Sequence, residues 1–64
     1  MSAQSEARAV YESPGYRRVK LELEGELLAR FRSTPAIEVD RLVEIKRMLD
    51  ALDQLDSLLA EWSA

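Results

Sequence analysis

Acidic side chains are the residues of this chain that come closest to a chemical site. Asp50, Asp53, Asp56 and Glu61 follow one another at helical spacings towards the C-terminus. Paired carboxylates act as general acid and base only in a pocket that shifts one pKa, and short helices leave little room for one. A calcium loop would need closely alternating oxygen ligands and a glycine. We therefore expect solvated carboxylates, with no catalytic residue and no metal ligand.

Hydroxyl side chains lack a base that would activate them. The chain contains no histidine and no cysteine, which also removes the usual ligands of zinc, haem and iron–sulfur clusters. Ser13, Ser33 and Thr34 stand at expected helix ends, where hydroxyl residues act as caps. The sequence predicts a protein that is not an enzyme, with no cofactor and no small-molecule substrate.

Charge argues against nucleic acid as a partner. The net charge is −3, and the acidic excess lies in residues 33–64. Phosphate binding needs several uncompensated cations, which this chain lacks. The one basic cluster, Arg17 with Arg18 and Lys20, is expected to pair with acidic residues of the long helix. Counting from the turn places Arg17 and Arg18 close to Asp50 and Asp53.

The first two helices are expected over residues 3–11 and 14–32. Ser2 or Ser5 can cap the first, and it must end before Ser13 because the residue preceding a proline is disfavoured in helical geometry. Ser13 then caps the second helix, with proline in its first position. The second helix carries one apolar stripe, made of Tyr16, Val19, Leu23, Leu27 and Phe31.

A third, longer helix is expected over residues 35–62, with Thr34 as its N-cap and Pro35 in the first position. No glycine or proline follows, so the helix can run for about 42 Å at 1.5 Å per residue. Its apolar positions recur at three- and four-residue steps. They are Leu42, Ile45, Met48, Leu49, Leu52, Leu55, Leu59 and Trp62.

These elements predict an all-α fold in a single domain over residues 1–64. The short connection around Thr34 favours an antiparallel αα-hairpin of the middle and long helices. Counting outward from that turn places Tyr16 near Leu52, and the first helix then packs on the overhanging end of the long one. A plain two-stranded coiled coil is the secondary interpretation, because the heptad phase from Ile45 holds for only about two and a half heptads.

Several apolar residues are left over by this scheme. Leu21 and Leu28 lie far around the middle helix from its stripe, and other leftover positions lie on the long helix. They are either scattered surface residues or a contact surface. We favour a surface for a protein partner or for further copies of the chain, because a core this small gains from association. The predicted partner interface comprises Leu21, Leu28, Val39, Val43, Leu58 and Trp62.

No targeting or membrane segment is expected. The first residues have neither a basic start nor an apolar run, which argues against a signal peptide. No stretch approaches 18 apolar residues, so the chain is not expected to span a membrane.

One resemblance adds a biological context. Residues 13–16 (Ser-Pro-Gly-Tyr), 26–35 (Glu-Leu-Leu-Ala-Arg-Phe-Arg-Ser-Thr-Pro) and 48–53 (Met-Leu-Asp-Ala-Leu-Asp) resemble a group of small helical proteins of tailed bacteriophages. Their genes lie among those for head and packaging proteins. The resemblance covers about residues 11–55 and departs from the group after the turn, where residues 36–40 are more apolar. It offers no catalytic residues.

The resemblance implies a structural or assembly protein that binds a larger virion or packaging component in multiple copies. Such a protein would act in the host cytoplasm during assembly, with the virion as a further location. The alternative is a regulatory adaptor that binds a host or phage enzyme, such as the transcription machinery, through the acidic C-terminal half.

Overall fold

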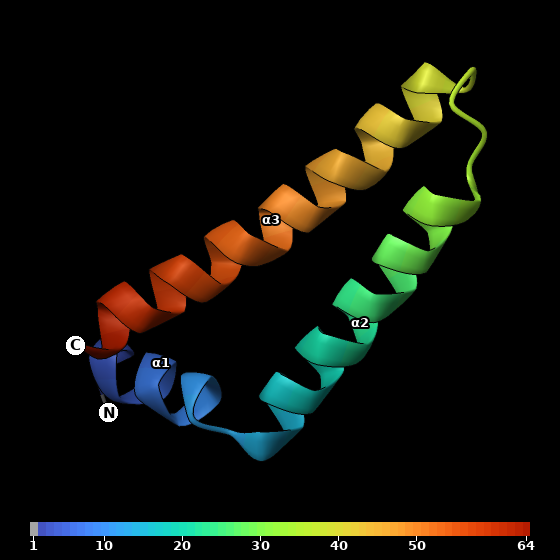
Figure 1. Cartoon of the computed structure of the whole chain (residues 1–64). Helices are drawn as coiled ribbons and strands as arrows, with labels where there is room; N and C mark the ends of the chain where they lie inside the picture. The colour runs from blue at the N-terminus through green and yellow to red at the C-terminus, as the bar shows by residue number, and fades with distance from the viewer. Residues whose placement is uncertain (1) are drawn as a thin grey trace.

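Three helices joined by two short connections make up residues 2–64. The computed structural model describes residues 2–64, in which α1 spans Ala3–Tyr11, α2 spans Pro14–Ser33 and α3 spans Val39–Ser63 (Figure 1). No strand occurs within this described range. The all-α class and the helical hairpin predicted from the sequence are therefore confirmed.

Capping explains why α1 and α2 begin where they were expected to begin. The Ser2 hydroxyl accepts a hydrogen bond from the Ser5 backbone N–H at 3.2 Å. The Ser13 hydroxyl accepts one from the Tyr16 backbone N–H at 3.5 Å, with Pro14 as the first helical residue. Local sequence therefore determines both of these helix starts.

The start of α3 differs from the prediction. Thr34 is the C-cap of α2 and does not cap α3: its hydroxyl donates to the Arg30 carbonyl oxygen at 2.6 Å. Its backbone is extended, as expected for the residue before proline. The same Arg30 carbonyl oxygen accepts the Thr34 backbone N–H at 3.0 Å, so Thr34 holds the end of α2 through both its backbone and its hydroxyl. Residues 34–38 form the connection, so the expected start of the long helix at Pro35 is wrong by four residues.

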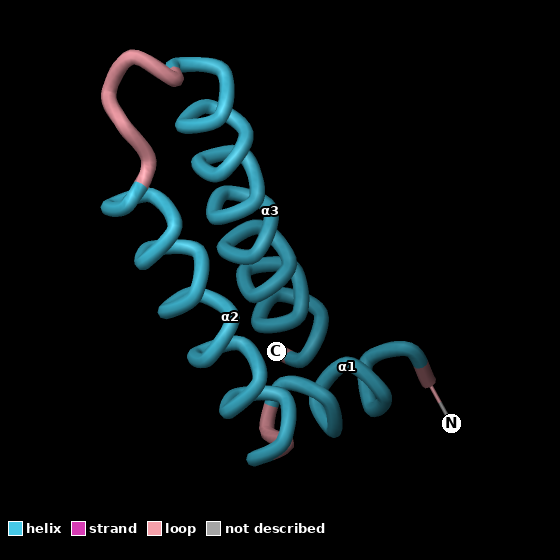
Figure 2. The backbone as a smooth tube through the Cα atoms, turned by 90° about the vertical axis from the view of Figure 1, so that its right-hand side faces the viewer, coloured by secondary structure: helices cyan, strands magenta, loops and turns pink. Residues whose placement is uncertain are grey.

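The hairpin is antiparallel, and α1 closes its open end. Figure 2 shows α2 and α3 side by side, with α1 turned across the C-terminal end of α3. The Arg8 guanidinium donates to the Ser63 carbonyl oxygen from Nε at 3.1 Å and from Nη2 at 2.7 Å. The Gln4 side chain donates to the backbone oxygen of Ala64. A cation at the C-terminal carbonyls of a helix is favourable, so these contacts fasten α1 to α3.

Register along the hairpin follows from the late start of α3. The Tyr16 hydroxyl reaches the Asp56 carboxylate, one helical turn beyond the Leu52 position that counting from the turn had indicated. A connection four residues longer moves the whole of α3 by about one turn relative to α2. Asp56, expected to be a solvated carboxylate, therefore lies on the line of contact between the two helices.

The core is small for a chain of this length. Among the described residues, the buried apolar side chains are Ala7, Leu27 and Ile45, which are 6%, 3% and 4% exposed. The molecule is elongated, at 48 × 18 × 13 Å with a radius of gyration of 14.5 Å. A compact domain of this length would have a radius of about 11 Å. Because the helices form a single layer, each helix is covered only where it touches a neighbour. Most apolar side chains therefore stay partly in solvent.

Candidate functional site

Exposed apolar side chains are the dominant feature of the surface. Among the described residues, thirteen large hydrophobic side chains are exposed, whereas only two, Leu27 and Ile45, are buried. Single exposed leucines are ordinary on a protein surface, but grouped ones mark contact sites. The grouping can be worked out from the helical rotation of about 100° per residue. In an antiparallel pair, residues displaced in the same rotational sense from the contact line lie on the same side of the pair.

The first side of the hairpin carries the leucine line, which we define as Leu21 and Leu28 of α2. The two lie about 100° to 120° around α2 from the buried Leu27. They are 71% and 49% exposed. Leu28 borders an open groove of about 560 Å³ that Gly25 also lines, and a Cβ added at Gly25 would meet nothing within 4 Å. The absence of a side chain at Gly25 therefore leaves room beside Leu28.

Val39 and Val43, also predicted at the interface, are exposed near the start of α3. They are rotated about α3 in the same sense as the leucine line is rotated about α2. Their angle from the buried Ile45 is about 120° to 160°. They therefore lie around the outer surface of α3, away from α2. The structure brings these valines to the same side as the leucine line without joining them to it.

The opposite side carries the α3 seam, which we define as Met48, Ala51, Leu55, Leu58 and Trp62. These residues lie about 60° to 140° from Ile45 in the other rotational sense. Leu55 and Trp62 are 48% and 58% exposed. Leu58 and Trp62, both predicted at the interface, therefore lie on the other side from the leucine line. The six residues predicted as one partner interface divide between two sides of the hairpin.

The side of the hairpin that carries the α3 seam also exposes side chains that the sequence had assigned to the core. Leu23 and Met48 were expected to be covered by the facing helix, yet they are 40% and 41% exposed. Val19 of α2 is also exposed and is rotated in the same sense as the α3 seam. The apolar stripes are wider than the contact between two helices, so only their central residues are covered. The seven-residue spacing from Met48 to Leu55 to Trp62 was the sequence signal for this surface.

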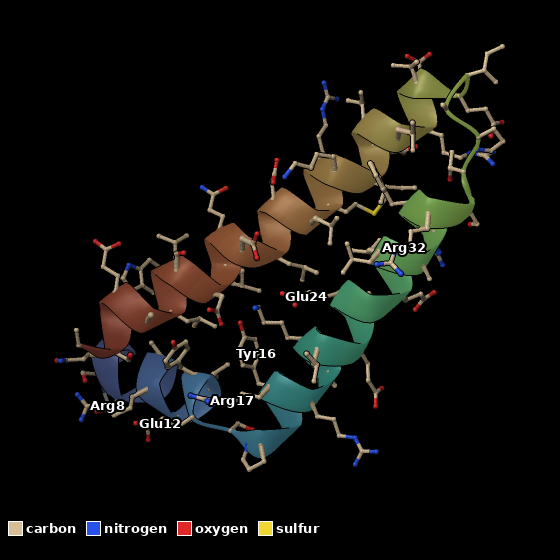
Figure 3. The ribbon with its side chains drawn as sticks, viewed as in Figure 1. Arg8, Glu12, Tyr16, Arg17, Glu24 and Arg32 are labelled. Carbon is tan, nitrogen blue, oxygen red and sulfur yellow. The ribbon has the colours of Figure 1, made fainter. Side chains whose placement is uncertain are left out.

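Polar side chains occupy the line of contact where α1, α2 and α3 meet. The Tyr16 hydroxyl donates to Asp56 Oδ1 at 3.2 Å, and Lys20 Nζ lies 3.9 Å from the same oxygen. Lys20 also contacts Glu24 Oε1 at 2.8 Å. Figure 3 shows Tyr16 extending from α2 towards this meeting point. Since each polar group has a partner, the cluster fixes the relative position of α2 and α3.

The contacts in this cluster raise the pKa values of both Tyr16 and Lys20. Burial raises the pKa of Tyr16 above 10.0, and the hydrogen bond and negative charge of Asp56 raise it further. The hydrogen bond to Glu24 raises the pKa of Lys20 above 10.5, with Asp56 adding to it. Tyr16 is therefore kept neutral and Lys20 charged at neutral pH. An open groove of about 330 Å³ borders Lys20 and Asp56.

The expected pairing of Arg17 and Arg18 with Asp50 and Asp53 is wrong, whereas Lys20 of the same cluster lies 3.9 Å from Asp56 of α3. Arg17 donates to a backbone oxygen of α1 at 3.2 Å, and Arg18 pairs with Glu22 of its own helix at 3.3 Å. Neither reaches Asp50 or Asp53. Arg18 lies on the face of α2 turned away from α3, so the i,i+4 partner is the nearest carboxylate.

Two further properties bear on the kind of site. No helix of residues 2–64 is long and apolar enough to cross a membrane. Within the same range, no group of three or more histidine, cysteine, aspartate or glutamate side chains is placed to hold a metal ion. The chain matches no known protein-family model, and no similar curated protein or solved structure was found.

Proposed function

We propose that the chain is a non-enzymatic interaction module that takes part in bacteriophage assembly, binding a larger virion or packaging protein in multiple copies. The observation that supports a binding role is the exposed apolar surface: within residues 2–64, thirteen large hydrophobic side chains are exposed and two are buried. The phage context is supported by the sequence resemblance over about residues 11–55. On this proposal the chain acts in the host cytoplasm during assembly and is carried into the virion.

The leucine line is the surface that we assign to the larger partner. Leu21 and Leu28 contact little of their own chain, and each fully buried leucine contributes about 1.5–3 kcal/mol. The adjacent groove beside Gly25 gives a partner side chain room to approach α2. This side is thus both apolar and accessible.

The regulatory alternative has less support from the contacts. Four acidic side chains occur from Asp50 onward, and two of these already have partners within the chain. Asp50 accepts from Lys46 at 2.8 Å, and Asp56 accepts from Tyr16. The acidic half therefore offers a partner fewer free charges than its composition implies.

Quantitative mass spectrometry of purified virions and assembly intermediates tests the proposed function. We expect the chain at many copies per particle, in a fixed ratio to a head or packaging protein. The Leu21→Ser/Leu28→Ser variant should remain helical by circular dichroism and be lost from these particles. Absence of the wild-type chain from virions and intermediates, together with co-purification with an enzyme, would favour the adaptor instead.

A further inference from the structure

The α3 seam has the spacing of a helix–helix contact. Met48, Leu55 and Trp62 recur every seven residues, and Ala51 and Leu58 lie between them, on the same side. This is the heptad pattern with which one helix packs against another along its length. The seam covers about 21 Å of helix at 1.5 Å per residue. The four large side chains of the seam remain 38–58% exposed.

We propose that a second copy of the chain covers this seam, with the two α3 helices antiparallel about a two-fold axis between Gln54 and Leu55. The inference rests on the proposed interaction role and names the partner for one of its two sides. This axis brings Met48 to within one residue of the level of Trp62 of the other copy, so each methionine meets a tryptophan. Thioether–aromatic contacts of this kind are favourable. Likewise, the small Ala51 lies opposite the large Leu58.

Charge at the rim of the seam fits the same symmetry. Arg47 and Glu61 flank the seam on one edge, and each is seven residues from Gln54. A two-fold axis near this level places Arg47 of each copy beside Glu61 of the other. Neither residue has an ion-pair partner among the described residues of its own chain. Rim pairs of this kind set the orientation of an interface more than its strength.

The chain exposes more surface than a compact monomer of its mass. It exposes 5081 Å², whereas a folded monomer of 7.3 kDa typically exposes about 4,200 Å². The excess of about 900 Å² is spread over the elongated molecule, and it is of the same order as the roughly 800 Å² that each partner buries in a standard interface. Val19 of α2 is exposed on the same side as the seam and, with Tyr16 beside Asp56, lies near the level of the axis, so the second copy would cover it as well.

Analytical ultracentrifugation with a seam variant and a matched control tests the dimer. The wild-type chain is expected to sediment at twice its 7.3 kDa mass at micromolar concentration. Leu55→Glu places two like charges at the axis and should give the monomer mass with helicity retained. Leu21→Glu, an equal change on the other side of the hairpin, should leave the dimer intact. A monomeric wild type, or equal dissociation of both variants, would overturn the proposal.

A charge exchange tests the orientation without touching the apolar seam. Arg47→Glu and Glu61→Arg should each weaken dimerisation several-fold at low salt, and the double exchange should restore it. Because the chain has no cysteine, a short thiol-to-thiol crosslinker gives a second measurement. Met48→Cys mixed with Trp62→Cys should yield crosslinked pairs of one variant with the other. Pairs formed only within each single variant would indicate a parallel dimer and contradict the antiparallel axis.

The two proposals fail in different ways. A chain that is monomeric in solution yet abundant in particles contradicts the dimer and leaves the assembly role standing. A chain that dimerises in solution but is absent from particles contradicts the assembly role and leaves the dimer standing.

Discussion

Tyr16 and Asp56 are the residues that set how α2 and α3 meet. Their hydrogen bond spans the hairpin, and Lys20 adds a positive charge to the same carboxylate. An aspartate within an otherwise apolar stripe is tolerated only where its oxygens have partners. Other registers of the two helices would leave Asp56 facing apolar side chains, so this contact favours one register over its neighbours.

The raised pKa values of Tyr16 and Lys20 predict that the fold weakens in alkali. Both groups hold their protons more strongly in the folded chain than at their ordinary values of 10.0 and 10.5. Their contribution to the free energy of unfolding is complete below pH 10 and is lost as the pH rises through the raised values. Denaturant titrations at increasing alkaline pH should show this loss, and Tyr16→Phe should reduce it. A stability that is the same for both chains at every alkaline pH would contradict the role of Tyr16.

Titration of Tyr16 itself gives a direct check on its partner. In a Tyr11→Phe background, Tyr16 is the remaining tyrosine, so tyrosinate absorbance follows a single group. Asp56→Asn removes the negative charge and should move the pKa of Tyr16 back towards 10.0. Unchanged absorbance titration in Asp56→Asn would mean that the two side chains do not interact in solution.

At the scale of elements, the start of α3 is the weakest junction. Glu38 occupies the N-cap position but makes no side-chain cap, and its ion pair with Arg41 is long at 3.9 Å and exposed. Glu38→Ser should supply the missing cap and raise the free energy of unfolding by about 1 kcal/mol. For a domain of this size that corresponds to about 4–8 °C in the thermal midpoint. Pro35→Ala, which alters the connection without adding a cap, is the control.

Leu23 and Leu27 belong to the same predicted apolar stripe of α2 but differ in burial. Leu27 is buried and Leu23 is exposed by 40%. Leu27→Ala should therefore cost about 2–5 kcal/mol through the cavity it leaves, which is enough to unfold so small a chain. Leu23→Ala should cost less than half of that in the monomer. Thermal melts followed by circular dichroism distinguish them, and equal losses would place Leu23 in the core after all.

Helix boundaries that depend on local chemistry were predictable from the sequence. Ser13 and Pro14 define the start of α2 by themselves, and the bounds of α1 follow from the same logic. Thr34 was not predictable in this way, because its hydroxyl has two possible uses. It can cap the helix that follows or the helix that precedes, and both patterns look alike in sequence. The register error followed from this one residue.

Only part of the candidate interaction surface was predictable at the scale of the whole molecule. Leu21 and Leu28 were identified because no facing stripe accounted for them, and they are exposed. Met48 and Leu55 were assigned to the core because their spacing suits either an internal or an external partner. Sequence periodicity shows that a face must be covered, but it does not show which chain covers it.

Size is one reason why we propose that this molecule associates. A 64-residue chain with no cysteine forms no disulfide and depends on its core, and this core contains three buried apolar side chains among the described residues. Covering the α3 seam and the leucine line would bury the apolar surface that the monomer leaves exposed. We therefore expect association and folding stability to be linked.

The thermal midpoint as a function of chain concentration tests this account most directly. An isolated monomer melts at the same temperature at every concentration, whereas a chain stabilised by association melts higher as its concentration rises. We predict that the wild-type midpoint rises over a hundredfold range of concentration, and that Leu55→Glu melts lower and at one temperature throughout. A wild-type midpoint that is independent of concentration, and equal to that of Leu55→Glu, would contradict the claim that this helical hairpin completes its core with a second copy.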